Sequence, residues 1–199
     1  MPQSDANKTR GEKVSTPRQS KGDWEKQHEA GSALRKTGIR VIGDLPWGAH
    51  ICLFYETKND LLEAAAAYFK AGLESNEFCV WAISEPITEE DARNSLREAI
   101  LDFDRHLGSK IEILPGNDVY LGEGQFELRK ITAGWHEKLR EARGKGFEGL
   151  RISGNAFWIQ TNLWKEFCEY EQELDQTLHD QTMIVLCTYS LGASRAQIF

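Results

Sequence analysis

A histidine and a cysteine stand two residues apart in the stretch HICLFY, at positions 50–55. Side chains at this spacing point to the same face of a strand, so His50 and Cys52 could reach one metal ion. Two further cysteines, Cys79 and Cys187, lie in other apolar runs, and the sequence contains no C-x-x-C pair typical of zinc sites. We therefore predict no metal and interpret the three cysteines as small buried hydrophobic residues. For His50, which starts its run, both metal binding and a simple polar contact stay open.

Phosphate chemistry is disfavoured by the segment that follows this run. The stretch YETKNDL, at 55–61, has no glycine, carries two acidic residues, and offers only Lys58 as a cation. A Walker loop needs glycines so that its backbone can approach phosphate closely. No G-x-G-x-x-G motif follows a predicted strand, the sequence has no G-x-S-x-G motif, and Cys168 has no evident base beside it. We predict that the protein is not an enzyme and holds no cofactor.

Aromatic residues gather in GNAFWIQTNLW, at 154–164, directly after an apolar run. Such a segment is typical of a pocket for a small, weakly polar ligand, and ordinary core packing is the alternative. Asn155 could orient a ligand through paired hydrogen bonds, or it could be a turn residue. The acidic stretch EYEQELD, at 169–175, is interpreted as a solvated helix face.

The remaining pattern alternates apolar runs with amphipathic stretches. The runs that predict buried strands are 50–55, 78–84, 110–114, 149–153 and 183–189. Helical spacing of apolar residues predicts helices near 59–74, from the N-cap Thr88 to Leu107, near 128–139 and near 163–178. Asp91, three residues after Thr88, makes an approximate capping box, and the apolar face of the first helix consists of Leu62, Ala66, Phe69 and Leu73. Strands that alternate with helices predict an α/β fold: a three-layer, mostly parallel sheet with helices on both faces. Ligands of such sheets bind beyond the carboxyl ends of the strands.

Composition indicates one soluble domain in 199 residues, of which 40% are hydrophobic. The net charge is -7; residues 1–22 carry five Lys/Arg and two Asp/Glu, so the remainder is more acidic still. An acidic body argues against nucleic acid as a partner. We predict a disordered tail at 1–22, a short helix or linker at 23–38, and one domain at 39–199. Four irregularly spaced cysteines, no apolar segment of membrane-spanning length and no secretory signal predict a cytoplasmic protein without membrane contact.

Four stretches together resemble the MEDS domain, a sensory module of methanogen and methylotroph regulators that is also found attached to sensor histidine kinases. They are WGAHICLFYE, YLGEGQFELRKITAGW, GFEGLRISGNAFW, and EYEQELD followed by MIVLCTYSL. The resemblance implies a RecA-like fold that has lost its phosphate loop. It also implies a sensor of simple hydrocarbon derivatives. The family's H-x-C-x-x-Y segment corresponds to His50, Cys52 and Tyr55; its R-x-[ST]-G segment and the residues after it correspond to Arg151, Ser153, Gly154, Asn155 and Trp158.

On this basis we predict a non-catalytic sensory domain of prokaryotic signal transduction. It binds a small organic ligand, such as a simple hydrocarbon derivative, and signals to a histidine kinase or a transcription regulator, as in a two-component system; a homodimer is compatible with this role. The ligand site is predicted where the first and fourth runs end, which the resemblance puts near each other. Its residues are His50, Cys52, Tyr55, Arg151, Ser153, Asn155, Phe157 and Trp158. The alternatives are a protein-interaction module without a ligand and a degenerate nucleotide-binding protein.

Overall fold

A five-stranded parallel sheet forms the centre of the molecule in the computed structural model, which describes residues 34–122, 125–126, 128–155 and 164–192. The strand order is β3-β9-β8-β4-β5. The bounds are β3 (His50–Tyr55), β4 (Phe78–Ile83), β5 (Ile111–Pro115), β8 (Leu150–Asn155) and β9 (Met183–Ser190). Each predicted run is a strand, with small differences at the ends. The predicted tail at 1–22 lies outside the described residues.

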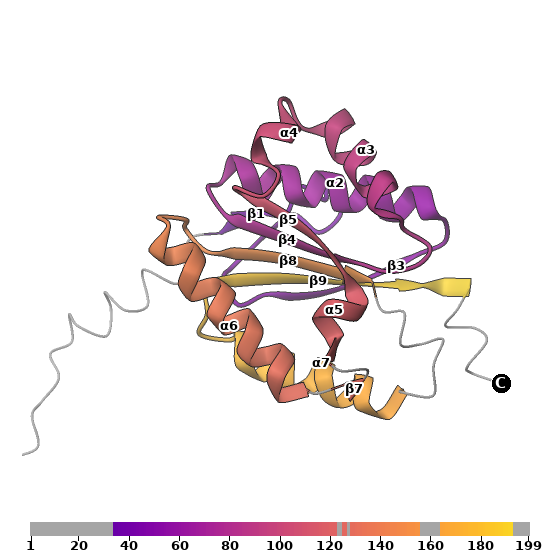
Figure 1. Ribbon diagram of the computed structural model, residues 1–199, viewed down its shortest axis with the longest axis vertical. Helices are drawn as coiled ribbons and strands as arrows, with labels where there is room; N and C mark the ends of the chain where they lie inside the picture. The colour runs from indigo at the N-terminus through magenta and orange to yellow at the C-terminus, as the bar shows by residue number, and fades with distance from the viewer. Residues whose placement is uncertain (1–33, 123–124, 127, 156–163, 193–199) are drawn as a thin grey trace, which may run out of the picture.

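Helices cover both faces of this sheet, which confirms the predicted three-layer arrangement (Figure 1). One face carries α2 (Lys58–Glu74), α3 (Glu89–Ala99) and α4 (Phe103–His106). The other face carries α5 (Gly116–Tyr120), α6 (Leu128–Gly144) and α7 (Trp164–Leu178). Two short antiparallel pairs complete the described structure: β1 (Arg35–Lys36) with β2 (Asp44–Leu45), and β6 (Leu121–Gly122) with β7 (Gln125–Phe126).

Capping boxes start the two long helices of the first face. The Thr57 hydroxyl accepts a hydrogen bond from the Asp60 amide, and the Asp60 carboxylate accepts one from the Thr57 amide. Thr88 and Asp91 make the same reciprocal pair at the start of α3, as the sequence predicted. The predicted single helix from Thr88 to Leu107 is wrong, because Asp102 adopts a left-handed conformation with φ 56° that separates α3 from α4.

The buried face of α2 differs from the predicted one by about one position. The sequence indicated Leu62, Ala66, Phe69 and Leu73, whereas the buried positions are Leu61, Ala65, Ala66, Tyr68, Phe69, Ala71 and Gly72. Several small residues allow either stripe to face inward. Gly72 lies on the buried side, where a Cβ atom would lie 2.5 Å from Cδ of Arg151 on the sheet below.

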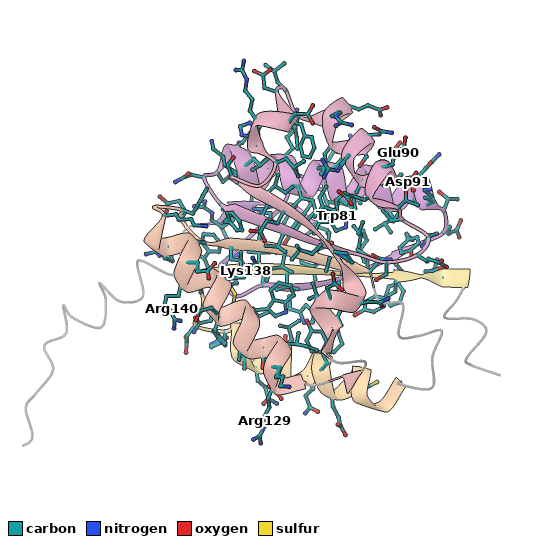
Figure 2. The ribbon with its side chains drawn as sticks, in the orientation of Figure 1. Trp81, Glu90, Asp91, Arg129, Lys138 and Arg140 are labelled. Atoms are coloured by element: carbon teal, nitrogen blue, oxygen red, sulfur yellow. The ribbon has the colours of Figure 1, made fainter. Side chains whose placement is uncertain are left out.

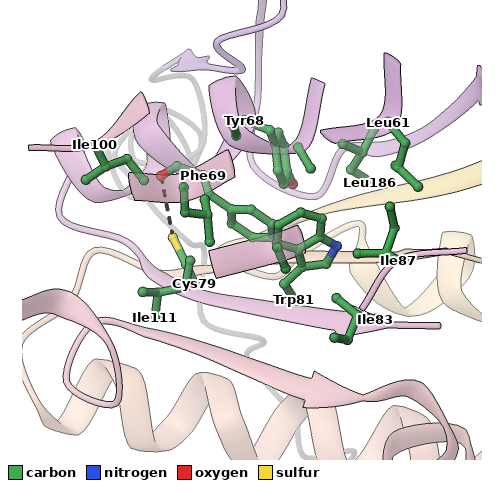
Figure 3. Close-up of a cluster of buried hydrophobic side chains, with 14 of the residues drawn as sticks. Leu61, Tyr68, Phe69, Cys79, Trp81, Ile83, Ile87, Ile100, Ile111 and Leu186 are labelled. Carbon is green, nitrogen blue, oxygen red and sulfur yellow. Dashed lines mark hydrogen bonds between the residues drawn. The ribbon is translucent and has the colours of Figure 1, made fainter. Parts of the chain in front are cut away.

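Two hydrophobic clusters sandwich the sheet. The cluster under α2 and α3 centres on Phe69 and Trp81, whose rings are 5.3 Å apart (Figure 3). The opposite cluster joins Trp135 of α6 and Leu174 of α7 to Val185 of β9. Figure 2 shows Trp81 on the α2 side and the charged Lys138 and Arg140 along α6. Strands β4, β8 and β9 are therefore buried on both faces, as their continuous apolar runs predicted.

The β1–β2 hairpin is fastened to the sheet by a buried ionic network. Glu77 and Arg151 have fully buried side chains and form an ion pair, and Arg35 of β1 binds the second carboxylate oxygen of Glu77 at 2.8 Å. The predicted domain boundary between residues 38 and 39 lies inside this hairpin, which pairs Lys36 with Asp44.

Candidate functional site

Strand β3 distributes its three predicted ligand-binding residues over both faces of the sheet. His50 and Cys52 face α7, as shown by their contacts with Glu171. Tyr55 belongs to the opposite cluster, with Leu61 of α2, and is buried. The period-2 geometry of a strand makes this division unavoidable, because 50 and 52 share a parity and 55 does not.

On β8, Arg151 is engaged at the amino end of the strand, away from the predicted carboxyl edge. Its guanidinium pairs with Glu77, donates to the backbone oxygens of Tyr68 and Lys36 at 2.9 Å each, and stacks over the Tyr68 ring at 4.6 Å. A buried guanidinium needs such partners. Arg151 therefore holds the fold together in the described structure.

The other two β8 residues also use their polar groups within the protein. The Ser153 hydroxyl donates to the Leu186 oxygen at 3.0 Å. The Asn155 side chain accepts from the Ser84 amide at 2.8 Å and donates to the backbone oxygens of Ser84 and Glu85 at 2.6 and 2.9 Å. Asn155 is 2% exposed, so its amide joins the end of β8 to the segment after β4.

The strand order separates the two ends of the predicted pocket. Strand β9 lies between β3 and β8, so Tyr55 and Asn155 stand at the ends of non-adjacent strands. Phe157 and Trp158, the predicted apolar wall, lie outside the described residues.

A different set of polar groups converges where His50 faces α7. Nε2 of His50 lies 3.3 Å from Sγ of Cys187 on β9 and 3.2 Å from a carboxylate oxygen of Glu171 on α7. One ligand atom from each of these three residues lies within 4.8 Å of the others. We call His50, Glu171 and Cys187 the β3–β9–α7 cluster.

Two residues extend the cluster. Cys52 is directly opposite Cys187 in the β3–β9 register, and its Sγ lies 3.9 Å from Glu171. Asp175, one helical turn after Glu171, approaches the other ring nitrogen of His50 at 4.0 Å. The predicted burial of Cys52 is wrong, because Cys52 is exposed on an edge strand; Cys79 and Cys187 are buried as predicted.

Burial and a nearby carboxylate set the protonation of the two thiols. Burial raises the pKa of Cys187 well above its ordinary value, and the charge of Glu171 raises it further. The pKa of Cys52 is also raised, first by partial burial and then by Glu171. Both sulfurs are therefore thiols at neutral pH unless a cation displaces their protons.

Sequence reasoning missed Glu171, Asp175 and Cys187 as members of one site. The i,i+4 spacing of Glu171 and Asp175 was visible, but the same spacing is typical of a solvated helix face. Glu171 and Asp175 reach His50 only because α7 packs across β3. This is a long-range contact, and no local sequence pattern predicts it.

A surface groove of about 720 Å³ lies elsewhere, between α2 and α3. Its lining mixes Leu62 and Ala66 with charged groups such as Glu63 and Lys70. It lies on the opposite face of the sheet from the β3–β9–α7 cluster. Its described lining residues bring together no set of His, Cys and carboxylate ligand atoms comparable to the cluster.

Comparison with known proteins adds a family to this geometry. A family model described as the methanogen/methylotroph, DcmR sensory domain (MEDS) matches residues 49–199. The chain belongs to the MEDS family. This MEDS domain thus carries its β3–β9–α7 cluster entirely within the matched region. No curated protein matches the chain.

Among solved structures, the MEDS domain is similar to a KaiC-like protein from the hyperthermophilic archaeon Pyrococcus horikoshii OT3. The TM-score is 0.59 at 17% sequence identity, over 79% of this chain and 72% of that protein. The likeness shows a shared RecA-like fold.

Within the described residues, no helix has the length and apolar character needed to cross a membrane.

Proposed function

We propose that this MEDS domain is a non-catalytic sensor that binds a small organic ligand, such as a simple hydrocarbon derivative, and passes the signal to a histidine kinase or a transcription regulator. The observation that carries the proposal is the match to a sensory-domain family over residues 49–199. The contacts at the start of α2 and around β3 support it further.

The start of α2 is ill suited to phosphate, which argues against nucleotide turnover. Thr57 and Asp60 already cap the first turn, and Asp60 adds negative charge where a phosphate would bind. Lys58, the one cation of the YETKNDL loop, is ion-paired with Asp91 of α3 at 2.5 Å. A phosphate would therefore have to displace an existing ion pair and overcome carboxylate repulsion.

The α7 side of β3 is the ligand site that the contacts favour. Phe54 is 57% exposed and lies 5.3 Å from the Tyr189 ring, on the same strand face as His50 and Cys52. An exposed aromatic ring beside polar groups suits a small ligand with one polar end. This placement moves the site from the predicted carboxyl edge to the long face of β3.

A thermal-shift screen separates this function from its two rivals. The full chain is melted with small alcohols, amines, halogenated hydrocarbons and ATP with magnesium, since a ligand that binds only the folded state raises the melting temperature. Stabilisation by one class of small organics is expected. Stabilisation by ATP with magnesium alone would indicate a nucleotide-binding protein, and no shift with any compound would favour an interaction module.

A matched pair of variants then tests the location. Phe54→Ala should weaken binding of the organic hit by about tenfold, because it removes an aromatic contact worth roughly 1 kcal/mol or more. Leu101→Ala, at an 89% exposed position beyond α3, should bind the hit as the parent does. Equal affinities of parent and Phe54→Ala would place the ligand elsewhere.

A further inference from the structure

The β3–β9–α7 cluster contains three different metal-ligating side chains from three elements. We propose that His50, Glu171 and Cys187 bind a divalent transition-metal ion, with Zn²⁺ the best match. The inference goes beyond the sensory function and does not depend on it. It also reverses the sequence-based preference for Cys187 as a plain core residue.

The two distances from His50 are close to those of tetrahedral coordination, and the ligand atoms of Glu171 and Cys187 lie within 4.8 Å of each other. With usual zinc–ligand bond lengths, two donors of one tetrahedral ion lie roughly 3.3–3.6 Å apart. Nε2 of His50 is 3.3 Å from Sγ of Cys187 and 3.2 Å from Oε2 of Glu171. A single N–H at Nε2 cannot point to both the Cys187 sulfur and the Glu171 oxygen. One metal ion between the three donor atoms would bind all of them.

A buried carboxylate oxygen is an independent sign of a cation. Oε1 of Glu171 is buried without a hydrogen-bond partner in the described part of the chain. Within the same part, no Lys or Arg forms an ion pair with Glu171 or Asp175. Leaving a buried carboxylate oxygen unpaired is costly, and a bound divalent cation removes that cost.

Asp175 occupies the position of an outer partner of the metal-bound histidine. Metal-ligating histidines almost always direct their second ring nitrogen to a carboxylate, carbonyl or water. Nδ1 of His50 faces Oδ1 of Asp175 at 4.0 Å, and the Asp175 side chain is 77% exposed and thus free to close this distance. This arrangement would fix Nε2 as the metal ligand.

The donor set selects the class of metal. A thiolate, an imidazole and a carboxylate suit Zn²⁺ or Co²⁺, whereas Mg²⁺ and Ca²⁺ take oxygen ligands. Cys52, which is opposite Cys187 and exposed, borders these three donors. Three protein ligands with one open position leave room for water or a small ligand on the solvent side.

Metal titration of the full chain tests the site. After treatment with a chelator, the protein is titrated with Zn²⁺ by calorimetry and with Co²⁺ by absorption. We expect one ion per chain with a Kd below about 1 µM, and a cobalt–thiolate charge-transfer band. Binding weaker than this, or cobalt binding without a thiolate band, would overturn the proposal.

Variants with matched controls identify the ligands. His50→Ala and Glu171→Gln should each weaken Zn²⁺ binding by at least about 100-fold, more than loss of an outer partner. The exposed neighbours His179→Ala and Glu169→Gln should stay within about tenfold of the parent. Unchanged affinity in His50→Ala or Glu171→Gln would refute the assigned site.

The buried Cys187→Ser variant is not needed for the test, which therefore holds even if this variant does not fold. The cobalt band of the parent protein reports a thiolate ligand. If the Cys52→Ser variant keeps this band, the ligand is Cys187. The result is also separable from the sensory function. Metal binding without any organic hit refutes only the sensor, and an organic hit for a protein that binds no metal refutes only the metal site.

Discussion

At the residue scale, the four cysteines have different surroundings although the sequence shows them alike. Cys79 is fully buried beside Phe69, and burial raises its pKa far above the ordinary value (Figure 3). Cys187 is buried against Glu171, whereas Cys52 and Cys168 are exposed. Because only thiolates react with thiol reagents, accessibility and pKa together determine the order of reaction.

We expect Cys168 to react first in native, metal-free protein, with Cys52 slower because its pKa is raised. Cys79 and Cys187 should react only after unfolding. Labelling with a disulfide reagent followed by peptide mass spectrometry gives the order directly. Rapid native labelling of Cys79 would contradict the packing of the α2 side of the core.

Also at this scale, Asn155, which was predicted to contact a ligand, forms hydrogen bonds within the protein. Its three bonds to Ser84 and Glu85 predict that Asn155→Ala lowers the free energy of unfolding by about 2–4 kcal/mol, because the alanine leaves buried backbone groups unpaired. Urea unfolding measures this loss, and a change below about 0.5 kcal/mol would show that water replaces the amide.

At the element scale, the start of α3 is joined to the start of α2. Asp91 accepts hydrogen bonds from Thr88 and pairs with Lys58, and these contacts lower its pKa from 3.8 to about 2, the Lys58 contact being the largest cause. Because the pKa of Asp91 is lower in the folded state than in the unfolded state, the carboxylate stabilises the fold at pH values above its unfolded-state pKa. This stabilisation is lost as the pH falls through the folded-state pKa.

Asp91→Asn should therefore reduce the loss of stability between about pH 5 and pH 2. Its neighbour Glu90, in the same exposed helical turn, supplies the control Glu90→Gln (Figure 2). The measurement is the urea midpoint of parent and both variants across this pH range. The capping scheme fails if Asp91→Asn keeps the acid sensitivity of the parent.

At the scale of the whole molecule, the Arg151–Glu77 pair connects the sheet, the end of α2 and the β1–β2 hairpin. Both side chains are fully buried, so removal of one partner leaves the charge of the other buried without a counter-ion. Arg151→Met should lower the free energy of unfolding by about 3–5 kcal/mol. The exposed pair of Arg140 with Glu137 provides the control, since Arg140→Met should change stability by less than about 1 kcal/mol. Equal effects in urea unfolding would mean that the buried network is not a structural centre.

The sequence by itself determined the five strands of the central sheet and the approximate positions of the main helices. Buried strands follow from apolar runs such as FCVWAI, and the start of α3 follows from the Thr88–Asp91 spacing, because both depend on residues a few positions apart. The shared face of His50 and Cys52 and the missing phosphate-loop glycines were also readable. These features are local, so no knowledge of long-range packing is needed.

Only the tertiary structure decided which of these faces meet. Insertion of β9 between β3 and β8 separated Tyr55 from Asn155, and the packing of α7 over β3 brought Glu171 to His50 and Cys187. Strand order and helix placement minimise the exposed apolar area of the whole chain. A helix stripe that appears solvated in isolation can therefore become one wall of a site when its neighbour is an edge strand carrying a histidine.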